Sequence, residues 1–167
     1  MKRVAIQDAN ILIDLIKIDL FTHCIELEFL FSTTQLVFET ELNDHQVKSL
    51  RRYIESGKFT IIEISEVELL EIQLMGEEDG RLSLQDWSTL YYSQKTGALL
   101  LSGDRVLRKV SEAKGIEVCG VLWIFDQLVG YAVISSADAH RYLNELMKHN
   151  KRLPAAECQR RLDDWSK

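Results

Sequence analysis

The sequence predicts an α/β fold in which five short strands form a parallel sheet covered by helices. Stretches with strand character alternate with stretches of helical periodicity, a pattern typical of βαβ units. Ala98–Leu101 is short and wholly apolar, as expected of a central strand that is covered on both faces. The apolar run Val4-Ala5-Ile6 ends at Gln7-Asp8 and passes directly into a helical pattern. This step is predicted to place Asp8 at the carboxyl edge of the sheet, where ligand sites of open α/β sheets lie.

The first half of the chain contains three predicted strands and two predicted helices. The apolar spacing after Asp8 predicts a helix over residues 9–20, for which Asp8 is a suitable N-cap. Residues 32–38 are predicted as the second strand, and residues 39–57 as a helix that ends at a glycine. Residues 58–64 are β-branched and aromatic, which predicts the third strand.

The second half alternates in the same way. Two capping boxes, in which a serine is followed three residues later by Glu or Asp, predict helices over residues 65–75 and 83–96. The remaining predictions, in order, are a strand at 98–101, a helix at 105–114, a strand at 116–118 and an apolar helix at 121–129. The apolar helix is explained mainly by core packing, although part of its surface, with Tyr131, could serve a homodimer or a partner groove.

Two further helices are predicted at the C-terminal end. A more polar helix covers residues 136–150, and Leu153-Pro154 separates it from a last amphipathic helix. The sequence contains no linker, repeat or low-complexity segment. The expected organisation is an α/β domain over residues 1–135 with a helical extension over residues 136–167 packed on the same domain.

Composition limits the classes of function. The formal net charge of the 167 residues is -6, which argues against binding nucleic acid with the whole surface but allows a local basic strip. No apolar run approaches the roughly 20 residues that span a bilayer, and the N-terminus lacks a signal-peptide pattern, so a cytoplasmic protein is expected. Cys24, Cys119 and Cys158 are widely spaced, which favours free thiols over a zinc site.

Four carboxylates follow predicted strands or open helices at the same edge of the sheet. They are Asp8, Glu41, Asp86 and Asp104. Each alone is explained by a helix cap or by the helix dipole. Together they would repel one another, and a bound Mg²⁺ or Mn²⁺ would relieve the repulsion because hard cations prefer oxygen ligands. A receiver domain is disfavoured because no lysine follows a late strand, and a phospho-aspartate phosphatase because position 10 is Asn.

The same residues lie in four motifs that resemble those of PIN-domain nucleases. The stretch from Asp8 to Leu15 resembles the opening motif, and Val37 to Leu42 resembles the second, with Glu41 before Leu42. Leu82-Ser83-x-x-Asp86 resembles the third motif, and Leu101-Ser102-Gly103-Asp104 with Leu107-Arg108 resembles the fourth. The order and spacing match over roughly residues 4–130. The resemblance implies a three-layer α/β/α sandwich with a central, mostly parallel five-stranded sheet, in which residues 1–135 are the PIN-like nuclease domain.

The resemblance also implies site residues. The catalytic site would comprise Asp8, Glu41, Asp86, Asp104 and Asn10, with Asp8, Asp86 and Asp104 as metal ligands and Asn10 orienting Asp8 or a water. Glu39 is an alternative to Glu41, which is preferred because it directly precedes Leu42. Val106 and Leu107 stand where many members have another acid or polar group. The resemblance therefore does not fix whether the site holds one metal ion or two.

Basic and aromatic side chains near this site are candidates for substrate binding. Arg105, Arg108 and Lys109 follow Asp104 and could hold phosphates, although Arg108 could instead brace a carboxylate. A second basic patch, at Lys148, Lys151 and Arg152, is interpreted as solubilising. Trp87 could stack on a base, but a core position is preferred. The four histidines fall in no shared motif.

Two functions follow from these patterns. The first is a metal-dependent ribonuclease that hydrolyses phosphodiester bonds, a class that includes toxins held inactive by an antitoxin protein. In this mechanism a carboxylate-bound Mg²⁺ or Mn²⁺ would lower the pKa of a bound water and stabilise charge on the phosphate. The second is a catalytically weakened PIN-like module that binds RNA or a protein partner.

Overall fold

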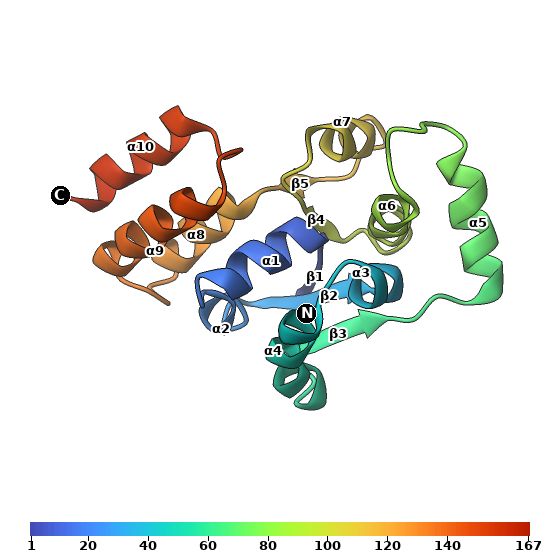
Figure 1. Cartoon of the computed structure of the whole chain (residues 1–167), viewed down its shortest axis with the longest axis horizontal. Helices are drawn as coiled ribbons and strands as arrows, with labels where there is room; N and C mark the ends of the chain where they lie inside the picture. Colours follow the sequence, from blue (N-terminus) through green and yellow to red (C-terminus); the bar gives the residue numbers. More distant parts are fainter.

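The computed structural model describes all residues from 1 to 167 and contains one five-stranded sheet with helices on both faces (Figure 1). The strands are β1 (Arg3–Gln7), β2 (Phe29–Thr34), β3 (Phe59–Ile62), β4 (Leu99–Leu101) and β5 (Val118–Cys119). All neighbouring pairs are parallel, in the order β3-β2-β1-β4-β5. The strand order changes direction at β1, so the carboxyl end of β1 is a topological switch point of the kind that carries ligand sites.

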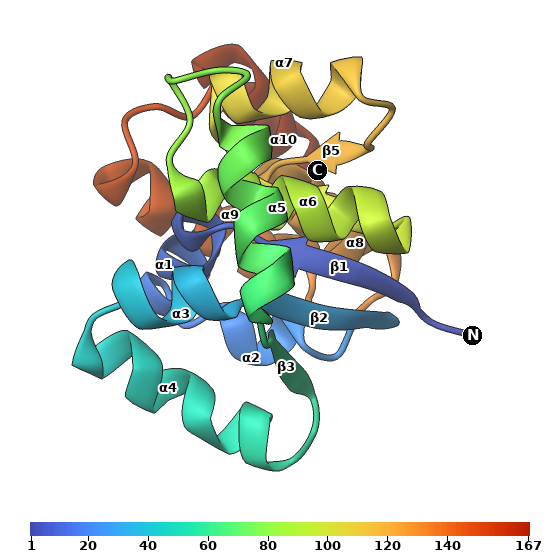
Figure 2. The same cartoon turned by 90° about the vertical axis from the view of Figure 1, so that its right-hand side faces the viewer.

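Ten helices connect or follow the strands, and they confirm the predicted α/β/α sandwich. They are α1 (Ala9–Lys17), α2 (Phe21–Cys24), α3 (Gln35–Thr40), α4 (Asp44–Glu55), α5 (Glu66–Gly76), α6 (Leu84–Thr96), α7 (Arg105–Ala113), α8 (Val121–Gly130), α9 (Ser136–His149) and α10 (Ala155–Trp165). Figure 2 shows α5 crossing in front of the sheet. None of the helices is both long and apolar enough to cross a lipid bilayer.

The core is divided between the two faces of the sheet because successive strand residues point to opposite sides. Ala5 of β1 and Leu101 of β4 belong to the larger cluster, which α1, α2, α4, α8, α9 and α10 cover. Ile6 and Leu100 point the other way, into a cluster that α5, α6 and α7 complete. The sheet is therefore buried on both faces, as the apolar run of β4 predicts.

The second strand and the helix after it differ from the sequence prediction of 32–38 and 39–57. β2 begins at Phe29 and ends at Thr34, because the Thr34 hydroxyl accepts a hydrogen bond from the Val37 backbone N–H (3.3 Å) and starts helix α3. The predicted long helix is two helices, because Asn43 forms a capping box that starts α4. The second motif therefore begins on α3, and Glu41 is the C-cap at the end of that helix rather than a residue in the first turn of one.

Two smaller boundary predictions are also wrong. The helix predicted over residues 9–20 ends at Lys17, and Asp19 has a φ of 59°, which stops a right-handed helix. The last strand is Val118–Cys119 rather than 116–118, because only Val118 and Cys119 pair with β4, opposite Leu100 and Leu101.

The C-terminal helices share the core of the α/β domain. Leu143 and Leu146 of α9 and Cys158 of α10 are fully buried in the larger cluster. The inward side of α8 is buried in the same cluster, whereas Tyr131, directly after α8, is 70% exposed. Helices α8, α9 and α10 lie together at one end of the molecule (Figure 1).

Candidate active site

Asp8 lies at the carboxyl end of the central strand and is held there by hydrogen bonds. Its backbone N–H donates to the Leu101 carbonyl (2.9 Å), which continues the β1–β4 pairing by one residue. Oδ1 of the side chain accepts from the Ala9 N–H (2.8 Å) and caps α1. Oδ2 accepts from the Ser102 hydroxyl (2.8 Å). Asp8 is only 2% exposed, so its carboxylate has a fixed position and little contact with solvent.

The surroundings of Asp8 disfavour its negative charge. The pKa of Asp8 is raised from 3.8 to about 7, mainly by burial. The carboxylates of Asp86 and Glu41 contribute to the rise, while hydrogen bonds from Ser102 and Ala9 oppose it. A carboxyl with this pKa is protonated in about half of the molecules near neutral pH. A cation beside it would restore the charged form.

Glu41 and Asp86 reach the same region from two different helices. Glu41 is the C-cap of α3, and Asp86 is the third residue of α6, where its Oδ2 accepts from the Ser83 N–H (3.0 Å). The Gln85 side chain donates to the Thr40 hydroxyl (2.8 Å), which ties α6 to the end of α3. Burial raises the pKa of Glu41, and the nearby Asp86 adds to this shift. The structure therefore brings Asp8, Glu41 and Asp86 within electrostatic range of one another.

The alternative residue Glu39 lies elsewhere on α3. It is exposed, and its Oε1 accepts from the Gln35 side chain (3.0 Å). Glu39 is not among the charges that shift the pKa of Asp8, whereas Glu41 is. Of the two glutamates, Glu41 is the one that joins the group around Asp8.

Asp104 is linked to Asp8 indirectly. Its Oδ1 accepts from the Leu107 N–H (2.8 Å) and caps α7, and its backbone N–H donates to the Ser102 hydroxyl (3.1 Å). Ser102 therefore bridges the two aspartates, a role that the sequence reading misses because Ser102-Gly103 reads as a turn. No three acidic, His or Cys side chains are close enough to hold a metal ion as they stand. The sequence predicts one compact cluster of four acids, and the structure does not contain it. Asp8, Asp86 and Asp104 each accept a backbone N–H at the start of a helix instead.

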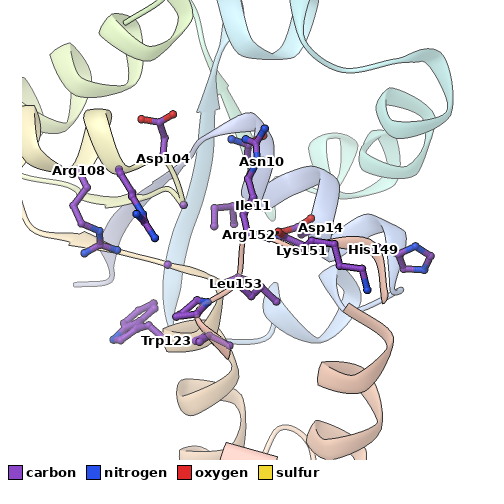
Figure 3. A pocket seen from close by; sticks show the side chains of 17 residues that line it. Asn10, Ile11, Asp14, Asp104, Arg108, Trp123, His149, Lys151, Arg152 and Leu153 are labelled. Carbon is purple, nitrogen blue, oxygen red and sulfur yellow. Dashed lines mark hydrogen bonds between the residues drawn. The ribbon is translucent and has the colours of Figure 1, made fainter. Parts of the chain in front are cut away.

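A pocket of about 630 Å³ adjoins the acidic residues (Figure 3). Asn10 and Asp104 line it on the side of α1 and α7, while the first turn of α8 and the loop between α9 and α10 line the rest. Asn10 is exposed in the first turn of α1, so its amide can reach a bound molecule. Asp8 itself does not line this pocket.

Basic side chains from two distant parts of the sequence line the pocket. Arg105 and Arg108 of α7 line it, but Lys109, the third predicted substrate-binding residue, does not. Arg108 is partly structural, because it donates to the Val118 carbonyl (2.9 Å) and pairs with Glu112 at 3.4 Å. Lys151 and Arg152 line the same pocket. The sequence interpretation of these residues as a solubilising patch does not anticipate this position. Only folding brings them to this edge of the sheet.

The donors around Asp8 fit a hard divalent cation. The candidate ligands are carboxylates, with the Asn10 amide nearby, and hard cations prefer oxygen atoms. Mg²⁺ is usually held by one or two carboxylates and keeps several waters, so widely spaced acids match its needs. The raised pKa of Asp8 further indicates a site in which negative charge lacks a partner.

Comparison with known proteins agrees with this architecture. The crystal structure of PAE2754 from Pyrobaculum aerophilum superimposes with a TM-score of 0.53 and 20% sequence identity, covering 78% of this chain and 99% of that one. No curated protein sequence matches the chain. A family model described as PIN domain matches residues 4–167, which include both C-terminal helices. The chain therefore belongs to the PIN domain family.

Proposed function

We propose that this protein is a Mg²⁺- or Mn²⁺-dependent ribonuclease that hydrolyses phosphodiester bonds at the acidic site around Asp8. PIN domains are generally nucleases, which supports hydrolysis of nucleic acid. The observation that carries the proposal is the buried Asp8 carboxylate, whose pKa is raised to about 7 by burial and by Asp86 and Glu41. A buried carboxylate close to other negative charges destabilises the fold when no cation is bound. Such a group is expected where binding a cation is part of the function.

The proposed metal ligands are Asp8 and Asp86, with Asp104 at the far side of Ser102. A divalent ion there would supply a Lewis acid that stabilises negative charge on the phosphate. Glu41 adds negative charge on the α3 side, which strengthens attraction for the ion.

The other side chains bind and orient the substrate. The Asn10 amide at the pocket edge can donate to a phosphate oxygen or orient a water beside Asp8. The Ser102 hydroxyl holds Oδ2 of Asp8, which keeps Oδ1 and Oδ2 in one orientation. Arg105 and Arg108 can hold flanking phosphates, with Lys109 as a more distant contact.

The proposal is tested by the same substitution at two glutamates, Glu41 at the C-cap of α3 and Glu39 within α3. Glu41→Gln is expected to lower the rate of RNA cleavage in Mn²⁺ by roughly 10- to 100-fold, because it removes one charge from the group that attracts the ion. Glu39→Gln is the matched control, since it makes the same change two residues away at a glutamate whose charge is not among those that shift the pKa of Asp8. Cleavage of a labelled RNA is measured with Mn²⁺, with Mg²⁺ and with EDTA.

Equal rates for Glu41→Gln and the parent would contradict the proposed role of Glu41. Cleavage by the parent that persists in EDTA would contradict metal dependence. A protein that binds RNA but cleaves none with either ion would favour the second candidate, a catalytically weakened module. The orientation of Asp104 onto its own helix is the observation that favours this second candidate.

The toxin of a toxin–antitoxin pair is a narrower form of the proposal. It requires that production of the protein arrests growth, that Asp8→Asn relieves the arrest, and that an adjacent gene encodes a small DNA-binding protein acting as antitoxin. Growth without arrest would exclude the toxin role and leave the ribonuclease proposal in place.

A further inference from the structure

We propose that the pocket between α1, α7, α8 and the α9–α10 loop binds the sugar–phosphate backbone of single-stranded RNA, with Lys151 and Arg152 as phosphate-binding residues. The inference rests on the proposed ribonuclease function and deepens it by assigning substrate recognition to the C-terminal helices. These basic residues follow none of the motifs that carry the acidic site.

The size and position of the pocket suit a nucleotide. Its volume of about 630 Å³ is within the roughly 300–1,000 Å³ range of small-molecule sites. Asn10 and Asp104 line one side of it, and Asp104 connects through Ser102 to Asp8. A strand lying in this pocket would contact Asn10 and Asp104, which lie close along the chain to Asp8 and Ser102. This position next to the acidic site favours RNA over an unrelated anion as the ligand.

The charge of the pocket favours a polyanion. Four cationic side chains line it, against two carboxylates, Asp14 and Asp104. The cationic residues are Arg105, Arg108, Lys151 and Arg152. Arg105, Lys151 and Arg152 are exposed and form no ion pair with a carboxylate. Nζ of Lys151 donates only to the Met147 carbonyl (3.1 Å), a neutral acceptor that a phosphate can replace. The net charge of the chain is -6, so this pocket is a local basic site on an acidic protein, and it is suited to a negatively charged ligand.

The loop that carries Lys151 and Arg152 is fixed to the domain. The Asn150 side chain donates to Oδ2 of Asp14 on α1 (2.8 Å), and its Oδ1 accepts from the Arg152 N–H (2.9 Å). The first bond ties the loop to α1, and the second fixes the backbone within the loop. The phosphate-binding side chains therefore extend from an ordered backbone, which lowers the entropy lost on binding.

An aromatic ring completes the pocket. Trp123, in the first turn of α8, lines the pocket and is partly exposed, and its ring packs edge-on against Phe29 with centroids 5.5 Å apart. Figure 3 shows Trp123 on the same side of the pocket as Leu153. A base next to the bound phosphates can contact this ring, and such contacts tolerate any sequence.

The test compares two double variants of the full chain. Lys151→Gln with Arg152→Gln removes two cations from the pocket, and Lys48→Gln with Arg51→Gln removes two from α4. Binding of a short fluorescein-labelled single-stranded RNA is measured by anisotropy in EDTA, across a series of salt concentrations. Circular dichroism melts check that both variants fold.

The pocket variant is expected to bind RNA roughly 10- to 30-fold more weakly than the parent near 0.1 M salt. The magnitude of its slope of log K against log salt is expected to fall by about 1.4, because each of the two lost phosphate contacts on a single strand contributes about 0.7. The α4 variant is expected to bind like the parent. Equal weakening in both variants, no weakening in the pocket variant, or no RNA binding by the parent would each overturn the inference.

Cleavage with Mn²⁺, measured on the same proteins, separates this inference from the proposed function. A parent that binds RNA through the pocket but cleaves none would refute the ribonuclease and leave the binding site standing. A parent that cleaves RNA, with a pocket variant that binds and cleaves equally well, would refute the pocket and leave the ribonuclease standing.

Discussion

Asp8→Asn is expected to reduce Mn²⁺-dependent RNA cleavage by roughly 10³-fold or more. The substitution keeps the size of the side chain and its cap on α1 but removes the negative charge at the centre of the acidic group. A metal contributes several kcal/mol of transition-state stabilisation, and each 1.4 kcal/mol or so is tenfold in rate. The measurement is the single-turnover rate of cleavage at saturating Mn²⁺.

Asp19→Asn is the matched control for this prediction. Asp19 is exposed and has a φ of 59°, a conformation that asparagine also accepts. Its variant is expected to cleave at the parent's rate. If Asp8→Asn cleaved as fast as Asp19→Asn while both proteins remained folded, Asp8 would have no part in the reaction.

The second large effect is on stability, and it depends on pH. The pKa of Asp8 is about 7 in the folded protein, against an ordinary value of 3.8, so the folded state holds this proton more tightly than the unfolded state. The contribution of Asp8 is therefore fully present below about pH 4 and is lost as the pH rises through 7. A shift of this size corresponds to about 4 kcal/mol. The raised pKa of Glu41 acts in the same direction.

The measurement is the free energy of unfolding from urea titrations in EDTA between pH 5 and 8. The metal-free parent is expected to lose stability across this range, and Asp8→Asn is expected to lose much less because asparagine does not titrate. At pH 8 the variant is expected to be the more stable of the two. A parent and a variant with the same pH dependence would show that Asp8 is not the group responsible.

Much of the fold could be predicted from local patterns. The wholly apolar β4 and the caps at Asp8, Ser83 and Asp104 predict elements that the structure contains. The region around Thr34 could not be predicted in this way. Residues 35–38 are apolar enough to read as a strand, but the Thr34 hydroxyl caps a helix there, and strand pairing with β1 is already complete at Ser32.

The sequence predicts the general place of the candidate site better than it predicts the directions and neighbours of the side chains there. Motif order alone predicts Asp8, Glu41 and Asp86 at one edge of the sheet. In the structure the charges of Asp86 and Glu41 act on Asp8, although no three acids are close enough to hold a metal ion. The Asp104 carboxylate accepts from the Leu107 N–H, as its predicted N-cap position requires, but motif spacing does not say how close this carboxylate comes to Asp8. Lys151 and Arg152 are visible in the sequence as a basic patch, but their place beside the site is not, because only the packing of α9 against the domain brings their loop to the pocket.

The most direct test of the central claim is a crystal structure of the protein soaked in Mn²⁺, with the ion located by its anomalous scattering. We expect an anomalous peak at bonding distance from the Asp8 carboxylate, about 2.1 Å for an ion of this kind, with Asp86 or Glu41 reaching it directly or through water. A well-ordered Asp8 with no peak beside it at saturating Mn²⁺, or a peak only at some other surface, would contradict the account.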